Sequence, residues 1–207
     1  MDTSVFWNVI GQYNQNTIII QGLLLVLIAI AIVISYTQTA AYFAKLLLGM
    51  ANLFIGVVFF GFYGTQPIQK FFAFPLFLIC GILFLYETYK NKNDVLRKPD
   101  LFQIILLLLY CLYPVVSLAL GNQFPKMVTH IMPCPVVSLS IAVYAGYKRK
   151  NKLLLLLLTI WGLTGIKSLI FNVYEDTILL LCGIYGVYLL IKEIRISKVS
   201  KGMEKKT

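Results

Sequence analysis

The chain has 207 residues, of which 59% are hydrophobic and only 13% are charged. Soluble domains carry about 25% charged residues, so this composition excludes an ordinary soluble enzyme and indicates an integral membrane protein. The net charge is +10, but the bases stand in short clusters beside apolar runs. That arrangement favours a lipid bilayer with anionic lipid at the basic clusters as the partner, and no nucleic acid.

Seven apolar runs follow one another along the chain, and a transmembrane helix needs about 20 such residues. The runs are longer than the strands of a membrane barrel and do not alternate with polar residues, so helices are expected. We predict an all-α fold, a single transmembrane bundle over 1–207 with spans near 17–36, 46–63, 71–86, 101–120, 133–147, 153–171 and 174–191.

The 18 Lys and Arg residues orient this bundle, because bases close to membrane spans are retained on the cytoplasmic side. With seven spans, fifteen of them share one side: Lys45, Lys90, Lys92, Arg97, Lys98, Lys148, Arg149, Lys150, Lys152, Lys192, Arg195, Lys198, Lys201, Lys205 and Lys206. Only Lys70 and Lys126 fall on the other side. The N-terminus is therefore predicted outside, with a basic cytoplasmic tail at 192–207. A re-entrant fifth run would turn the cluster at 148–152 and the tail outward, so seven spans are preferred.

Residues 1–16 contain no Lys or Arg, so they lack the charged region of a signal peptide and are expected to persist. Phe6, Trp7 and Tyr13 make the segment partly amphipathic, which predicts a short helix at the outer interface. Two roles fit it: an aromatic anchor for the first span, or a lid over an outward-facing cavity.

The stretch at 121–140, GNQFPKMVTHIMPCPVVSLS, separates the fourth and fifth runs on the predicted outer side. Proline disfavours helical geometry in the residue before it, so Met132 and Cys134 are expected to be extended and the fifth helix to begin at Pro135. Irregular backbone at membrane depth must be buried in protein or line a wet cavity. Transporters place substrate sites in such interrupted segments.

Two side chains here, His130 and Cys134, raise the question of a metal or redox site next to Pro133. One His and one Cys are too few for a closed zinc or copper site, so neither a metal nor a cofactor is predicted. The other thiols, Cys80, Cys111 and Cys182, lie within apolar runs. Structural packing and a functional thiol at Cys134 both stay open.

Lys167 is the base inside the sixth run, and Glu175 and Asp176 open the seventh. Two interpretations apply to Lys167: its ammonium reaches the outer interface, or it pairs with one of these acids inside the bundle. Together with His130 and 133–135, these three residues form the candidate outer-side site.

Four blocks of the sequence carry a family resemblance: FWNVIGQYNQNT, IGVVFFGFYGTQPIQKFFAFPLFLICGILF, YPVVSLALGNQFPK with MPCPVVSLSIAVY, and GIKSLIFNVYEDTILLL. The chain resembles an uncharacterised prokaryotic family of small multi-pass membrane proteins with a Pro-Cys-Pro motif, here at 133–135. It differs in carrying Tyr174 where that family usually has Pro, and Val136 and Val137 where Thr is expected. The resemblance implies a membrane location and no assigned activity.

Three functions remain open from the sequence. The first is a transporter or channel-like protein for a small solute or ion, with its site on the outer side. The second is an accessory or interaction subunit without catalysis, either self-associating or bound to another membrane protein. The third is a thiol-based redox or metal-handling protein that depends on Cys134. In each case the resemblance implies a protein of the prokaryotic cytoplasmic (inner) membrane, and the basic clusters are expected to face the cytoplasm.

Overall fold

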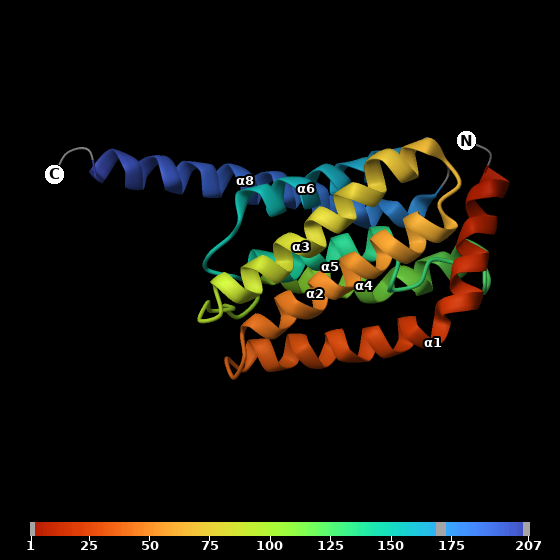
Figure 1. Ribbon diagram of the computed structural model, residues 1–207, viewed down its shortest axis with the longest axis horizontal. Coiled ribbons are helices and arrows are strands. Elements are labelled where there is room, and N and C mark those ends of the chain that lie inside the picture. Colours follow the sequence, from red (N-terminus) through yellow and green to blue (C-terminus); the bar gives the residue numbers. More distant parts are fainter. Residues whose placement is uncertain (1–2, 169–172, 205–207) are drawn as a thin grey trace.

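The computed structural model describes residues 3–168 and 173–204, and the regular structure within them is helical throughout (Figure 1). This confirms the predicted all-α class. The α-helices are α1 (Thr3–Tyr36), α2 (Tyr42–Phe54), α3 (Phe74–Lys90), α4 (Leu101–Ala119), α5 (Pro133–Ala145), α6 (Lys152–Leu163) and α8 (Thr177–Glu204). Adjoining them are the π-helices η1 (Ile55–Tyr63) and η2 (Gln69–Ala73), and the 3-10 helices η3 (Thr164–Lys167) and η4 (Tyr174–Asp176).

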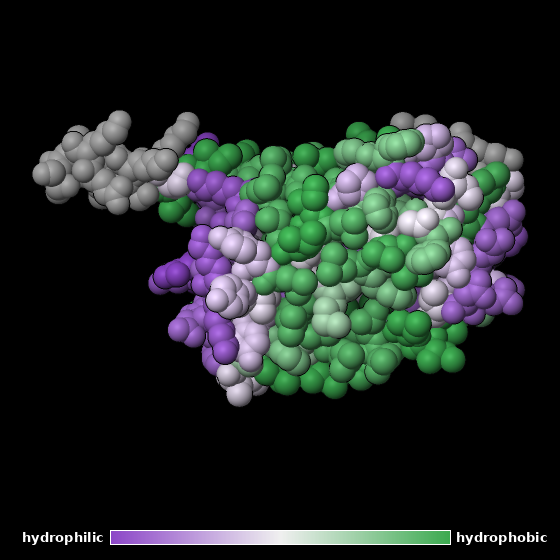
Figure 2. All heavy atoms as spheres, in the orientation of Figure 1, coloured by the Kyte–Doolittle hydropathy of each residue, from purple (hydrophilic) through white to green (hydrophobic). Residues whose placement is uncertain are grey.

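Five continuous helical segments of the described residues are long and apolar enough to cross a membrane. They are Ser4–Tyr36, Tyr42–Tyr63, Gln69–Lys90, Leu101–Ala119 and Tyr174–Ser197. The other two apolar runs form the shorter helix α5 and the pair α6 with η3. Positions 169–171 of the sixth predicted run, 1–2 of the outer segment and 205–207 of the tail lie outside the described residues. Figure 2 shows a broad hydrophobic band between two hydrophilic ends, as expected for helices held in a bilayer.

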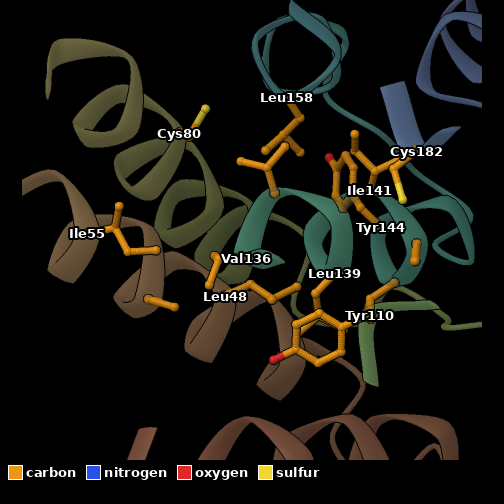
Figure 3. Close-up of a cluster of buried hydrophobic side chains, with 14 of the residues drawn as sticks. Leu48, Ile55, Cys80, Tyr110, Val136, Leu139, Ile141, Tyr144, Leu158 and Cys182 are labelled. Atoms are coloured by element: carbon orange, nitrogen blue, oxygen red, sulfur yellow. The ribbon is translucent and has the colours of Figure 1, made fainter. Parts of the chain in front are cut away.

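The short helix α5 lies inside the bundle. It contacts α2, α4, α6 and α8, while the surrounding helices contact one another in the order α1, α2, α3, α6, α8 and α4. Of the 13 residues of α5, only Cys134 and Ala145 are not fully buried. Figure 3 shows Val136 and Leu139 among side chains from the neighbouring helices. A helix of about 20 Å, at 1.5 Å per residue, suffices here because protein rather than lipid surrounds it.

The first helix, α1, is continuous from Thr3 to Tyr36, so the predicted segment 1–16 and the first span belong to one element. Figure 1 shows that it changes direction: its first part crosses one end of the bundle, and its second part runs beside α2. Thr17 Oγ1 donates to the carbonyl of Tyr13 at 2.6 Å. Hydroxyls that bond a carbonyl one turn back bend helices, which accounts for the change of direction.

Buried amides of α1 hold the irregular connection between α4 and α5. Asn14 Nδ2 donates to the carbonyl oxygens of Pro125 and Met127, each at 2.8 Å. About two turns further along, Gln21 Oε1 accepts from Thr129 Oγ1 at 2.7 Å. The backbone of this connection is thus satisfied inside the protein, as its predicted position at membrane depth requires.

The opposite end of the bundle contains a buried ion network. Lys45 Nζ lies 2.8 Å from Asp94 Oδ2 and 3.8 Å from Glu87 Oε2, and it stands 4.2 Å from the centre of the Tyr147 ring. Lys45 is 0% exposed. α2 begins at Tyr42 and carries Lys45 into the interior, where carboxylates distant in sequence neutralise it.

Two connections at this same end are joined by backbone hydrogen bonds. Leu96, between α3 and α4, forms an isolated antiparallel bridge with Tyr147, between α5 and α6. The Arg97 N–H donates to the Gly146 carbonyl at 3.0 Å, and the Lys148 N–H donates to the Val95 carbonyl at 3.1 Å. Backbone bonds and buried charges therefore close this end.

Small residues bring α6 and α8 together. A Cβ atom on Gly162 would lie 2.7 Å from the Cα of Gly183, and one on Gly183 would lie 2.5 Å from the carbonyl carbon of Gly162. Only glycine permits this backbone contact.

Candidate functional site

A cavity of about 390 Å³ opens at the end of the bundle where the first part of α1 crosses it. Its walls come from the first turns of α1 and α5, from η1 and η2, from the end of α6 and from η3 and η4. The aromatic lining residues are Phe6, Phe59, Phe60, Phe72 and Trp161. The polar lining residues are Gln69, Cys134, Thr164, Lys167, Ser168 and Asp176. The volume lies within the range of ligand pockets, about 300–1,000 Å³.

Helices depart from α geometry where they reach this cavity. The π-helices η1 and η2 carry three of the wall phenylalanines, Phe59, Phe60 and Phe72. The 3-10 helices η3 and η4 carry Lys167 and Asp176. Pro75 gives the physical reason for η2: its ring would clash with the carbonyl four residues earlier in an α-helix. The wider turn before it, in which the Phe74 N–H bonds the Gln69 carbonyl, relieves that clash. Such π segments occur frequently at functional sites.

The Pro-Cys-Pro motif begins α5 at the floor of the cavity. Met132 is extended, with φ −128° and ψ 164°, as predicted, but the helix starts at Pro133 rather than Pro135. The prediction that Cys134 is extended is therefore wrong. N–H groups of a first helical turn have no partner within the helix, so prolines at its first and third positions cost no hydrogen bond.

The two halves of the predicted site meet at Cys134 and Asp176. Cys134 Sγ donates to Asp176 Oδ2 at 3.3 Å. The short 3-10 turn before α8 positions the acid, with the Asp176 N–H bonded to the Val173 carbonyl at 3.1 Å. Gly165 of η3 permits the approach, since a Cβ there would lie 2.7 Å from the Asp176 carbonyl oxygen. Among the described residues, no base lies within 4 Å of the Asp176 carboxylate.

Lys167 lines the same cavity and is exposed. Within the described part of the chain it forms no ion pair with either acid, so the predicted pairing with Glu175 or Asp176 is not present. Both charges nevertheless face one space.

Trp161 forms part of the cavity wall and packs edge to face on Phe60 and Phe77, with ring centres 5.5 and 4.9 Å apart. Its Nε1 atom is buried, and no partner for it occurs among the described side chains and backbone. A polar ligand atom in the cavity would supply the missing acceptor.

Two predicted site residues do not reach the cavity. Glu175 Oε1 accepts from Ser117 Oγ and Asn122 Nδ2, each at 2.8 Å, and so ties α4 to the start of α8. His130 packs against Tyr110, with ring centres 5.2 Å apart. The structure therefore brings together 133–135, Lys167 and Asp176.

A model of the family of unknown function DUF6064 matches residues 3–201. The chain belongs to the DUF6064 family. Neither a curated protein nor a solved structure matches it.

The sequence pointed to the charged and motif residues of this DUF6064 protein but not to its aromatic wall. Phe59, Phe60 and Trp161 lie in uniformly apolar runs, where lipid-facing and cavity-facing aromatic residues look alike. Gln69 carried a signal, because it is a polar residue two positions after Pro67 and just before the third predicted span. Among the described residues, no group of three or more His, Cys, Asp or Glu side chains is placed to hold a metal ion.

Proposed function

We propose that this DUF6064 protein crosses the prokaryotic cytoplasmic membrane seven times, with its N-terminus outside. Support comes from seven main helices that run alternately between the two ends of the bundle (Figure 1). The Lys- and Arg-rich connections and the tail gather at one end, which by the positive-inside rule is cytoplasmic. The cavity then faces outward. The same basic clusters would contact anionic lipid.

Labelling of single cysteines tests this orientation. In a variant lacking the four native cysteines, Gln123→Cys and Asn93→Cys place exposed thiols at opposite ends of the bundle. We expect an impermeant maleimide to label Gln123→Cys in intact cells and to label Asn93→Cys only after permeabilisation. The reverse pattern would overturn the orientation, and labelling of both in intact cells would show that α4, which separates the two positions, does not cross the membrane.

We propose further that the protein binds a small organic solute in the outer cavity and transports it. The observation that carries this proposal is a cavity of about 390 Å³ built from interrupted helices at one end of the bundle, while buried ions and paired connections close the other. Transporters alternate between such one-sided states, with the solute held among discontinuous helices. The interior between the two ends is filled by α5.

Uptake into proteoliposomes tests transport, with a panel of radiolabelled amino acids, amines, carboxylates and sugars. Saturable uptake is expected for one solute class. Phe60→Ala removes a side chain from the cavity wall and so enlarges the cavity. Phe62→Ala is the matched control, because the Phe62 side chain is 78% exposed on the surface of the bundle and does not line the cavity. We expect the first to change the KM for uptake and the second to leave it unchanged. No flux for any member would refute transport and favour the accessory role, and equal effects of the two variants would refute the cavity as the route.

A further inference from the structure

We infer that the solute recognised by the outer cavity is a small zwitterion with an apolar body, bound through Asp176 at its ammonium and Lys167 at its carboxylate. This inference rests on the proposed function, that the cavity binds a solute, and adds the chemical class of that solute.

Asp176 supplies the recognition of positive charge. Its carboxylate lines the cavity and has a thiol, Cys134 at 3.3 Å, as its side-chain partner. A carboxylate out of bulk water is costly unless it is paired with an opposite charge. No base lies within 4 Å of it among the described residues. The partner that the site lacks is therefore a cation, and an ammonium group brought by the solute provides it with charge-assisted hydrogen bonds.

Lys167 supplies the recognition of negative charge. It lines the same cavity but remains exposed, which places its flexible side chain at the opening. A simple organic cation would meet Asp176 but would be repelled by this ammonium, and a simple anion would meet the reverse problem. A solute that carries both charges satisfies both side chains, whereas a neutral solute would leave Asp176 desolvated and unpaired.

The rest of the cavity wall favours a solute whose uncharged part is apolar. Phe59, Phe60, Phe72 and Trp161 form apolar and aromatic surface on which a hydrocarbon or aromatic side chain gains contact area. An ammonium near the face of such a ring gains further attraction.

Three ligands that share one body and differ only in charge test the inference. They are phenylalanine, 2-phenylethylamine and 3-phenylpropanoate, with leucine, 3-methylbutylamine and 4-methylpentanoate as a second series. Binding to the full-length protein in nanodiscs is measured by calorimetry. We expect a zwitterion to bind about 10- to 100-fold more tightly than its amine or its acid, since a charged hydrogen bond contributes about 1.5–3 kcal/mol.

Variants that remove one charge each test which side chain binds the ammonium and which binds the carboxylate of the solute. Asp176→Asn should weaken binding of the zwitterion and of the amine and leave binding of the acid unchanged. Lys167→Gln should weaken binding of the zwitterion and of the acid and leave binding of the amine unchanged. Lys167 is exposed, so its variants preserve the fold, and Lys167→Arg should retain the preference. Equal binding of all three charge forms, or tighter binding of an amine or acid, would refute the inference that the solute is a zwitterion. Binding of any ligand that is insensitive to Phe60→Ala would instead overturn the outer cavity as the binding site.

Discussion

The ammonium of Lys45 lies 2.8 Å from the carboxylate of Asp94, 49 residues further along the chain, and both side chains are buried. Glu87 completes the network at 3.8 Å. Coulombic attraction between buried groups offsets their desolvation only while the partners remain together. This contact joins α2 to the connection between α3 and α4. The stability of the closed end therefore depends in part on Lys45.

Removal of that base should strongly destabilise the protein. Lys45→Met leaves two buried carboxylates without a cation, and we expect a loss of about 3–5 kcal/mol in the free energy of unfolding. Lys148→Met removes an exposed base from the same end and serves as the control. Unfolding in mixed micelles, followed by circular dichroism, measures both. Equal stability of the two variants would contradict a structural role for the network.

The contact between Gly162 and Gly183 predicts that α8 tolerates no side chain at this point. Gly183→Ala places a methyl group 2.5 Å from backbone carbon of α6, and overpacking of this kind costs about 1–3 kcal/mol. Gly22→Ala is the control, because a Cβ there has no neighbour within 4 Å; the better helix propensity of alanine should make it neutral or stabilising. The melting temperatures of both variants in the same detergent test this prediction. A melting temperature for Gly183→Ala at or above that of the native chain would show that the helices separate freely.

The all-helical class and the positions of the apolar runs could be predicted from hydropathy, because every run must be apolar whichever neighbours it has. The interior position of α5 could not, since its composition resembles that of lipid-facing helices and only tertiary contacts distinguish them. The burial of Lys45 could not be predicted either, because Glu87 and Asp94 neutralise it from a distance in sequence that no local pattern reveals. Within the site, charge and proline marked Cys134 and Asp176, whereas the aromatic wall left no local trace.

Asn14 should be essential to the connection between α4 and α5. Asn14→Leu removes the donor from the partly buried carbonyl of Pro125 and the buried carbonyl of Met127, and a buried group left unsatisfied costs about 1–3 kcal/mol. Asn16→Leu makes the same substitution at an exposed position two residues away. We expect the first variant to lose thermal stability and to become sensitive to protease near Lys126, and the second to match the native chain. Indistinguishable digestion patterns would contradict this assignment.

His130 is expected to make stability depend on pH in a narrow window. Burial lowers the pKa of His130 below its usual value of 6.5, and a hydrogen bond with the backbone of Cys111 acts in the opposite direction. The unfolded chain therefore takes up a proton first as the pH falls below about 6.5, so the folded state loses stability there and regains it above that pH. His130 is the only histidine of the chain. Melting temperatures at pH 7.5 and 5.5 should therefore differ more for the native chain than for His130→Gln. An identical difference in both proteins would show that the imidazole titrates as freely in the folded state as in the unfolded one.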